Sequence, residues 1–387
     1  MNRISFLKDV LICSLGAYGG PEAHYGVFMD QMVAKKKYIT EEELIELIAL
    51  CGLLPGPGST QTIVAIGYKM GGPILGFLTM LVWGLPAIII MTALSFLSEI
   101  FDSFNLNPAI LRFIAPMSAG FIILAAYRIG KKVIHDPLTV ALFIMGLLMT
   151  YFVRRAWTFP LILIIGGIVA IISSKEENLW SRPKLRPNWN IIIAFLGFAI
   201  FGSLLYGTTG SKLFYLFDRF YRYGYLVFGG GQVVVPMMYT DLVEISKYMT
   251  GEQFLTGYGL VQGIPGPMFS FSAYASAMSA TGNGVLYKII AGFIGGIGIF
   301  LPGILLIYFV YPLWEELKAV KSIKISLRGI NAVAGGMISS AALIILRNAG
   351  LSISNTIILI LTIIILATKR IPAPLVVLGV IIAGILF

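Results

Sequence analysis

Charged residues are scarce in this chain. They make up 12% of the 387 residues, whereas 58% are hydrophobic and the mean hydropathy is +0.90. This composition excludes a soluble globular domain and indicates a protein with many membrane spans. The net charge is +10, but the basic residues gather in short loops between apolar runs. Because this distribution follows the positive-inside rule, we expect a lipid bilayer around the chain and no nucleic-acid partner.

Residues for metal binding and acid–base chemistry are also few. The chain has 2 histidines and 2 cysteines, and its loops lack metal-ligand spacing. A membrane-embedded enzyme acting on lipid phosphate is therefore a weak alternative, and we expect no catalytic residue, no cofactor and no metal. Cys13 and Cys51 lie in apolar segments, where we interpret them as small packing residues.

The most informative motif interrupts an apolar run. Residues 44–70 would form one membrane-spanning helix, but they contain Pro55-Gly56-Pro57. Two prolines in three residues cannot stay inside a helix, and nonhelical backbone at membrane depth must be buried in protein or line a wet cavity. A helix that restarts past this break offers N–H groups and hydroxyls at a positive end, which suits an anion. The predicted site residues here are Gly56, Gly58, Ser59, Thr60 and Gln61.

The same device recurs 210 residues later as Pro265-Gly266-Pro267. Without a gap, residues 19–57 match residues 229–267 at 11 of 39 positions, and a shift of 6 continues the register, pairing Pro86 with Pro302. The second motif adds three candidate site residues, Gln262, Gly266 and Ser270. Two broken helices indicate two homologous halves.

Two further breaks contribute candidates. Gly19-Gly20-Pro21 ends the first apolar run, and the glycine-rich stretch at 229–231 occupies the same place in the second half. Glycine lets the backbone approach a ligand, because a side chain would block its N–H groups. His24 either adds charge or titrates near the ion, or it is a neutral histidine bonded to a carbonyl. The site residues predicted here are Gly19, Gly20, His24, Gly229, Gly230, Gly231 and Gln232.

The segment count gives the organisation. We divide the chain into an N-terminal repeat (1–174), a cytoplasmic linker with one connecting span (175–211) and a C-terminal repeat (212–387). Six segments plus one span insert the second copy upside down. We therefore predict an all-α polytopic membrane protein with two inverted-topology repeats, whose broken half-helices meet near the membrane midplane. A parallel repeat with one miscounted segment is the alternative.

These motifs together resemble the chromate ion transporter family, in its long form with two homologous halves. The resemblance covers nearly the whole chain and includes residues 19–24, 54–61, 228–236 and 262–267. It implies a multi-pass protein of the plasma (inner) membrane that exports chromate, an oxyanion shaped like sulfate. In that family the glycine-rich stretch often carries histidine where this chain has Gln232.

The residues alone reach the same class but leave the ion open. Donors placed for chromate also suit sulfate, so proton-coupled uptake of sulfate or another oxyanion is an alternative. Export of a dianion is favoured electrically at an inside-negative potential, since each charge crossing 100 mV is worth about 2.3 kcal/mol. Whether two copies pair as a homodimer is open as well.

Overall fold

The computed structural model describes residues 2–105, 107–153, 155, 157–176, 186–227, 234–317, 320–348 and 352–386, and these residues form helices and loops without strands. In the first half the helices are α1 (Arg3–Gly16), α2 (Pro21–Phe28), the π-helix η1 (Met29–Lys35), α3 (Glu41–Leu53), α4 (Gly58–Leu94), α5 (Leu97–Ser103), η2 (Pro108–Leu111), α6 (Ile114–Val133), α7 (Pro137–Phe152) and α8 (Thr158–Ile172).

The rest of the chain begins with α9 (Trp189–Thr209) and continues with a second series of helices. These are α10 (Lys212–Tyr225), α11 (Val234–Tyr239), the π-helix η3 (Thr240–Ile245), α12 (Gly251–Gly263), η4 (Met268–Ser270), α13 (Phe271–Ser279), α14 (Val285–Val310), η5 (Tyr311–Leu313), α15 (Trp314–Leu317), α16 (Lys321–Asn348), α17 (Ile353–Ala367) and α18 (Ala373–Leu386).

Five of the described helical stretches are long and apolar enough to cross a membrane, and four shorter apolar helices accompany them. The long ones are Gly58–Leu94, Ala109–Val133, Trp189–Thr209, Val285–Leu313 and Lys321–Arg347. This confirms the prediction of an all-α polytopic membrane protein. The connecting span predicted within 175–211 is α9, and only 6% of its most apolar window is buried inside the protein.

Local sequence explains where the broken helices begin. Thr40 caps α3 and exchanges hydrogen bonds with Glu43, while Thr250 caps α12 and does the same with Gln253. Both are capping boxes, and the spacing of Thr40 to Glu43 and of Thr250 to Gln253 alone predicts them. Each capped helix has 13 residues and ends just before its Pro-Gly-Pro break. The two halves therefore build their broken helices in the same way.

One boundary differs from the sequence prediction. The sequence alone indicates a separate apolar span at 73–97, but this stretch is the second limb of α4, which continues from the break helix across a kink. The kink lies at Gly71 and Gly72, whose backbone angles are nonhelical, directly before Pro73. A proline tolerates a helix on its C-terminal side only, so the chain bends here instead of ending.

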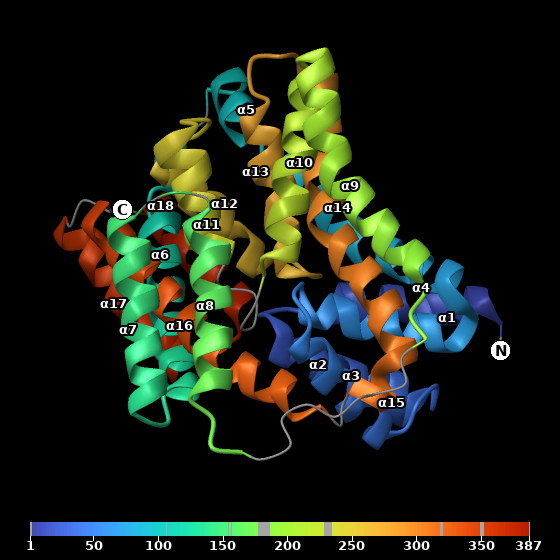
Figure 1. Cartoon of the computed structure of the whole chain (residues 1–387). Coiled ribbons are helices and arrows are strands. Elements are labelled where there is room, and N and C mark those ends of the chain that lie inside the picture. The colour runs from blue at the N-terminus through green and yellow to red at the C-terminus, as the bar shows by residue number, and fades with distance from the viewer. Residues whose placement is uncertain are drawn as a thin grey trace.

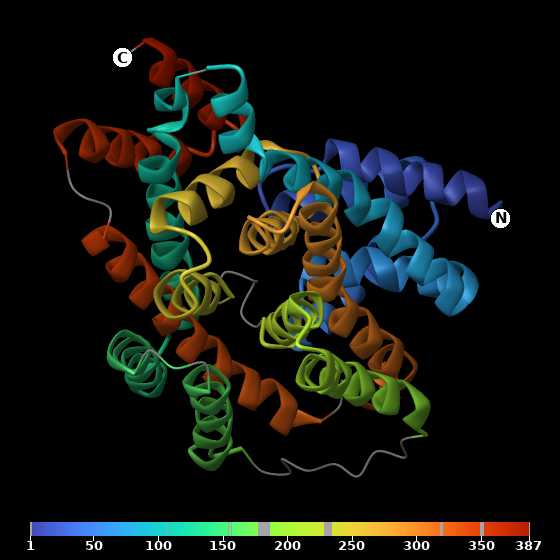
Figure 2. The same cartoon turned by 90° about the horizontal axis from the view of Figure 1, so that it is seen from above.

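The two halves are interlocked (Figure 1). Helix α16 packs against α7 and α8 of the first half, and α6 packs against α17 and α18 of the second. Small residues permit close approach, because a Cβ on Gly146 would lie 2.3 Å from the Val333 carbonyl oxygen and one on Gly336 would lie 2.0 Å from that of Phe143. Seen from above, these six helices form one side of the molecule and the helices α1, α4, α9 and α14 the other (Figure 2).

Candidate functional site

The first break lies at the start of α4. Helix α3 ends at Leu53, Gly56 has a φ of +133°, and α4 starts at Gly58 with Pro57 as its N-cap. The first N–H groups of a helix have no partner inside the helix, so those of Gly58, Ser59 and Thr60 point out of its positive end. Ser59 and Thr60 are at least 95% buried. The break is therefore an enclosed set of neutral donors.

His24 reaches this helix start from α2. Its Nδ1 and the Ser59 hydroxyl share a hydrogen bond of 2.9 Å. The His24 ring is 1% exposed, and its Nε2 has no partner among the described residues. With Nδ1 accepting, Nε2 carries the proton; with Nδ1 donating, the Ser59 hydroxyl hydrogen is free. In either tautomer the pair keeps one hydrogen that has no partner among the described residues.

Trp83 is a site residue that the sequence analysis missed. It is fully buried, its indole N–H donates to the Thr60 hydroxyl at 3.1 Å, and its ring meets that of His24 edge to face at 5.3 Å. Because the Thr60 oxygen accepts from the indole, its own hydrogen is available to a ligand. The signal was in the sequence, since an indole N–H at membrane depth needs an acceptor.

The Gln61 side chain stabilises the break by hydrogen bonds to the backbone. Its amide nitrogen donates to the carbonyl oxygens of Pro55 at 3.0 Å and of Gly303 at 3.2 Å. Both amide hydrogens are thus used on backbone, and the side-chain oxygen has no partner among the described residues. Gln61 holds the nonhelical residues against α14 of the other half.

The second break shares this backbone but not its side chains. Gly266 has a φ of +105° and is followed by η4, where the Ser270 hydroxyl donates to the Pro267 carbonyl oxygen at 2.7 Å. The Gln262 amide nitrogen lies 3.4 Å from the Met268 sulfur. The Ser270 hydroxyl and the Gln262 amide nitrogen thus contact their own segment.

Two reciprocal hydrogen bonds join the breaks to the opposite halves. The Gly56 N–H donates to the Val227 carbonyl oxygen at 2.8 Å, and the Gly266 N–H donates to that of Ala17, also at 2.8 Å. Gly56 and Gly266 are counterparts at the repeat offset of 210, and so are Ala17 and Val227. Each glycine therefore bonds to the counterpart of the residue to which the other glycine bonds. Such reciprocity marks a two-fold relation between the halves.

Because of these hydrogen bonds, the chain after Ala17 in the first half lies beside the Pro-Gly-Pro break of the second half. Gly19 and Gly20, with φ of +84° and +99°, follow Ala17 and so lie beside the Gly266 break. Val227 lies beside the Gly56 break, and the residues that follow it carry the remaining candidates. Those candidates, Gly229, Gly230, Gly231 and Gln232, lie outside the described residues.

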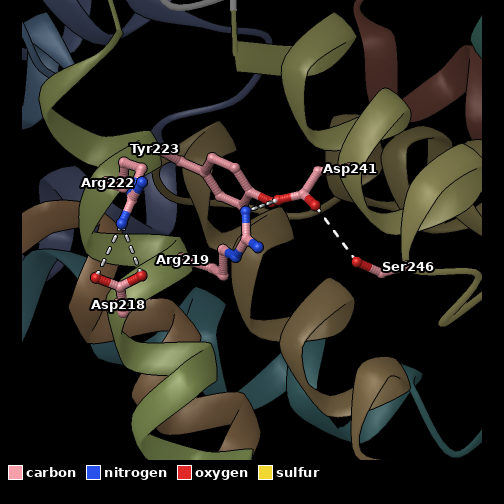
Figure 3. Close-up of polar contacts among 6 residues, drawn as sticks. All are labelled: Asp218, Arg219, Arg222, Tyr223, Asp241 and Ser246. Carbon is pink, nitrogen blue, oxygen red and sulfur yellow. Dashed lines mark hydrogen bonds and ion pairs between the residues drawn. The ribbon is translucent and has the colours of Figure 1, made fainter. Parts of the chain in front are cut away.

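A charged cluster joins α10 to the π-helix η3 (Figure 3). Arg219 donates to Asp241 at 3.1 Å, Tyr223 donates to the same carboxylate oxygen, and Ser246 donates to the other oxygen at 3.4 Å. Asp241 is 3% exposed. A buried charge needs such partners, because an unpaired charge away from water is very costly. Asp218 pairs instead with Arg222, one turn along α10.

The first half has a matching cluster between α1 and η1. Asp9, 2% exposed, accepts from Gln31 at 2.9 Å and from Tyr38 at 2.7 Å, and pairs with Lys36 at 3.2 Å. Asp9 and Gln31 lie 210 positions before Arg219 and Asp241. Neither cluster was predicted as a unit, because its members come from separate helices.

The chain is similar to one protein family and to several transport proteins. The sequence profile of the chromate transporter family matches residues 4–172 and 214–385. A probable chromate transport protein of Synechococcus elongatus is 24% identical over 96% of this chain and 93% of its own length. An uncharacterized transporter of Methanocaldococcus jannaschii is 26% identical over 81% of this chain and 76% of its own length.

A third relative, the chromate transport protein of Cupriavidus metallidurans, is 22% identical over 95% of this chain and 89% of its own length. No solved structure matches the chain. The two matched ranges of the family profile leave out α9 and cover both broken helices. The chain therefore belongs to the chromate transporter family.

Proposed function

We propose that this protein transports chromate across the plasma membrane and that it works in the direction of export. The proposal rests on membership of the chromate transporter family and on relatives whose names state chromate transport. The substrate is an oxyanion, and the chain contributes a helical membrane scaffold with one polar helix start inside it.

The observation that carries this proposal is the first break. A tetrahedral dianion that leaves water needs several donors at once, since burying an uncompensated charge is very costly. The start of α4 offers three N–H groups, the Thr60 hydroxyl and the hydrogen of the His24–Ser59 pair. Neutral donors bind the ion without a fixed counter-charge, so release stays feasible. The proposed anion-binding residues are Gly58, Ser59, Thr60 and His24, with Gly56 and Gln61 shaping the break.

The direction follows from charge. Moving two negative charges outward through 100 mV of inside-negative potential yields about 4.6 kcal/mol. Uptake of the same ion faces that barrier and needs more than two protons per turnover. Among the described residues at the first break, His24 is the one side chain with an imidazole or carboxyl group, and it is buried. Electrogenic export without a coupled ion is therefore the proposed mode.

We also propose that the repeats are inverted, divided as 1–174, 175–211 and 212–387. Support comes from helix directions around α7. Arg328, near the start of α16, pairs with Asp136 at the start of α7, while Arg347, near the end of α16, contacts Tyr151 at the end of α7. Helix α16 is thus parallel to α7. Helix α6 ends where α7 begins, so it runs opposite to its counterpart α16.

A labelling experiment tests this topology. Lys131 and Arg347 are counterparts in the two repeats, and both are exposed. Inverted repeats require that a cysteine at position 131 is labelled only from the cytoplasm and one at position 347 only from outside. Labelling of both from the same side would support a parallel repeat instead.

Flux measurement tests the function. The purified protein in liposomes, with a potassium–valinomycin potential and no pH gradient, should move chromate toward the positive side. Chromate, sulfate, molybdate and phosphate are compared at the same potential. Sulfate flux that follows a pH gradient and ignores the potential would reject electrogenic export and favour proton-coupled sulfate uptake.

Two single substitutions localise the site. Thr60→Ala and Ser59→Ala should each weaken chromate transport about fivefold, the effect of one neutral hydrogen bond of ~1 kcal/mol. Ser326→Ala is the matched control, because the Ser326 hydroxyl donates to its own helix at Ile323. Equal flux in all three variants would contradict a site at the first break.

A further inference from the structure

The two breaks can be compared position by position. A shift of 210 relates the residues around the breaks, and a shift of 216 relates the later parts of α4 and α14. A small cavity lies at the second break. Its walls are Val234, Val235, Met238, Tyr258, Met268, Phe269, Phe271, Ser272 and Ile299. Its counterparts in the first half are His24, Tyr25, Phe28, Ile48, Gly58, Ser59, Gln61, Thr62 and Trp83. The cavity is therefore the second copy of the candidate anion site.

The chemistry of the two copies is opposite. Val234 replaces His24, Phe269 replaces Ser59, and Ile299 replaces Trp83. Met268 stands where Gly58 starts α4, so the second half has a side chain at a position where the first half has none. These replacements remove the imidazole, the hydroxyl and the indole N–H that gather at the first break.

The hydroxyls that remain at the second break are turned inward. Ser270 donates to the Pro267 carbonyl oxygen and Ser272 to that of Phe269, each at 2.7 Å. Both are fully buried. The cavity wall is consequently apolar, and an apolar cavity stays dry. A dianion entering it would lose its hydration, because the described residues that line the cavity expose no polar atom to compensate the charge.

We infer that each chain has one oxyanion site, at the first break, and that the second break is a dry apolar barrier to ions. This inference rests on the proposed function, because it takes the first break as the site. Hydrophobic constrictions stop ions by excluding water, which is the property that Phe269, Phe271 and Ile299 give to the second break. The fold thus has two breaks of similar backbone, of which the first binds the anion and the second blocks the passage of ions.

Binding stoichiometry tests the inference. Equilibrium dialysis of the purified full chain with radiolabelled chromate should give one bound anion per chain at saturation. Two anions per chain would overturn the single-site inference and leave the proposed function standing. No bound anion would overturn both.

A reciprocal pair of variants tests which break binds. Ser59→Phe places the second-half residue into the first break and should weaken chromate binding at least about tenfold, through lost donors and a blocked helix start. The matched variant Phe269→Ser does the reverse and should leave affinity within about twofold, since no donor of the site is touched. Equal losses in both would overturn the inference, provided that both proteins elute as folded species in gel filtration.

The barrier has its own readout. Phe269→Ser should raise the passive leak of sulfate and chromate from preloaded liposomes at zero potential, because a hydroxyl at this position wets the cavity. Phe121→Ser serves as the control, because Phe121 lies on α6 and does not line the cavity. A leak that is equal in wild type and Phe269→Ser would overturn the assignment of the second break as a barrier.

Discussion

In each half a charged cluster joins the first helix to the π-helix, but the charged residue on the first helix is acidic in one half and basic in the other. On α1 the charged residue is Asp9, and its partner on the π-helix is the neutral Gln31. On α10 the corresponding residue is Arg219, and its partner is Asp241. Because the contact is common to both halves and the sign of charge is not, these clusters tie the first helix of each half to its π-helix. Neither needs to touch the anion.

The clusters also differ in the solvent exposure of their charged side chains. The Lys36 side chain that pairs with Asp9 is 42% exposed, whereas the Arg219 and Asp241 side chains are 25% and 5% exposed. Lys36 can return to solvent when its partner is removed. Arg219 cannot do so as easily. The second-half cluster should therefore be the more sensitive to loss of one partner.

The largest expected effect is that of Asp241→Ala. It leaves Arg219 partly buried without its carboxylate and removes the acceptor of Tyr223, which together should cost about 3–5 kcal/mol of stability. Thermal unfolding in detergent measures this loss. Asp30→Ala is the control, because the Asp30–Lys35 pair is more than half exposed on both sides and is expected to contribute about 0–1 kcal/mol.

Asp9→Ala should cost less, about 1–3 kcal/mol. It leaves the neutral groups of Gln31 and Tyr38 without an acceptor, which is the penalty of buried unpaired hydrogen-bond donors. The same unfolding assay compares it directly with Asp241→Ala. If Asp9→Ala proves the more damaging, the distinction between the two clusters drawn from exposure is wrong.

Removing both charges of the second cluster should be milder than removing one. The double variant Arg219→Met with Asp241→Leu is expected to cost about 1–3 kcal/mol, because it leaves no uncompensated charge and only the buried Tyr223 hydroxyl loses its acceptor. Together with the two single variants it forms a double-mutant cycle. Additive losses in that cycle would mean that the pair is not coupled.

Ser246→Ala should have the smallest effect, about 0.5 kcal/mol or less, because its hydrogen bond to Asp241 is long at 3.4 Å. Its counterpart in the first half is Lys36. Lys36→Ala should exceed it slightly, since a charge-assisted contact is lost. Chromate flux should be unchanged in both variants, and a loss of flux at preserved stability would place the clusters on the ion path.

Much of the fold was readable from the sequence because it is encoded locally. The capping boxes at Thr40 and Thr250, the breaks at Gly56 and Gly266 and the additional span at α9 all follow from short patterns. The repeat offset then related the halves. These features depend on neighbouring residues, on propensities and on apolar length.

The contacts of the site were less predictable. Trp83 meets Thr60 from 23 positions away, and Gln61 meets Gly303 from 242 positions away, so no local pattern relates them. The π-helices were also missed, since their periodicity resembles that of an α-helix over so short a length. The opposite polarity of the two breaks was present in the aligned repeats, but only the cavity at the second break gave it meaning.

The reciprocal bonds between Gly56 and Val227 and between Gly266 and Ala17 have a consequence for assembly. Each half supplies one carbonyl acceptor to a glycine N–H of the opposite half. A chain made of one half alone would leave a glycine N–H and a carbonyl oxygen without these partners, and lipid satisfies neither group. Such a chain closes its hydrogen bonds only by meeting a second copy in the same two-fold arrangement. The pair of halves, joined or separate, is then the smallest unit that can stand complete in a membrane.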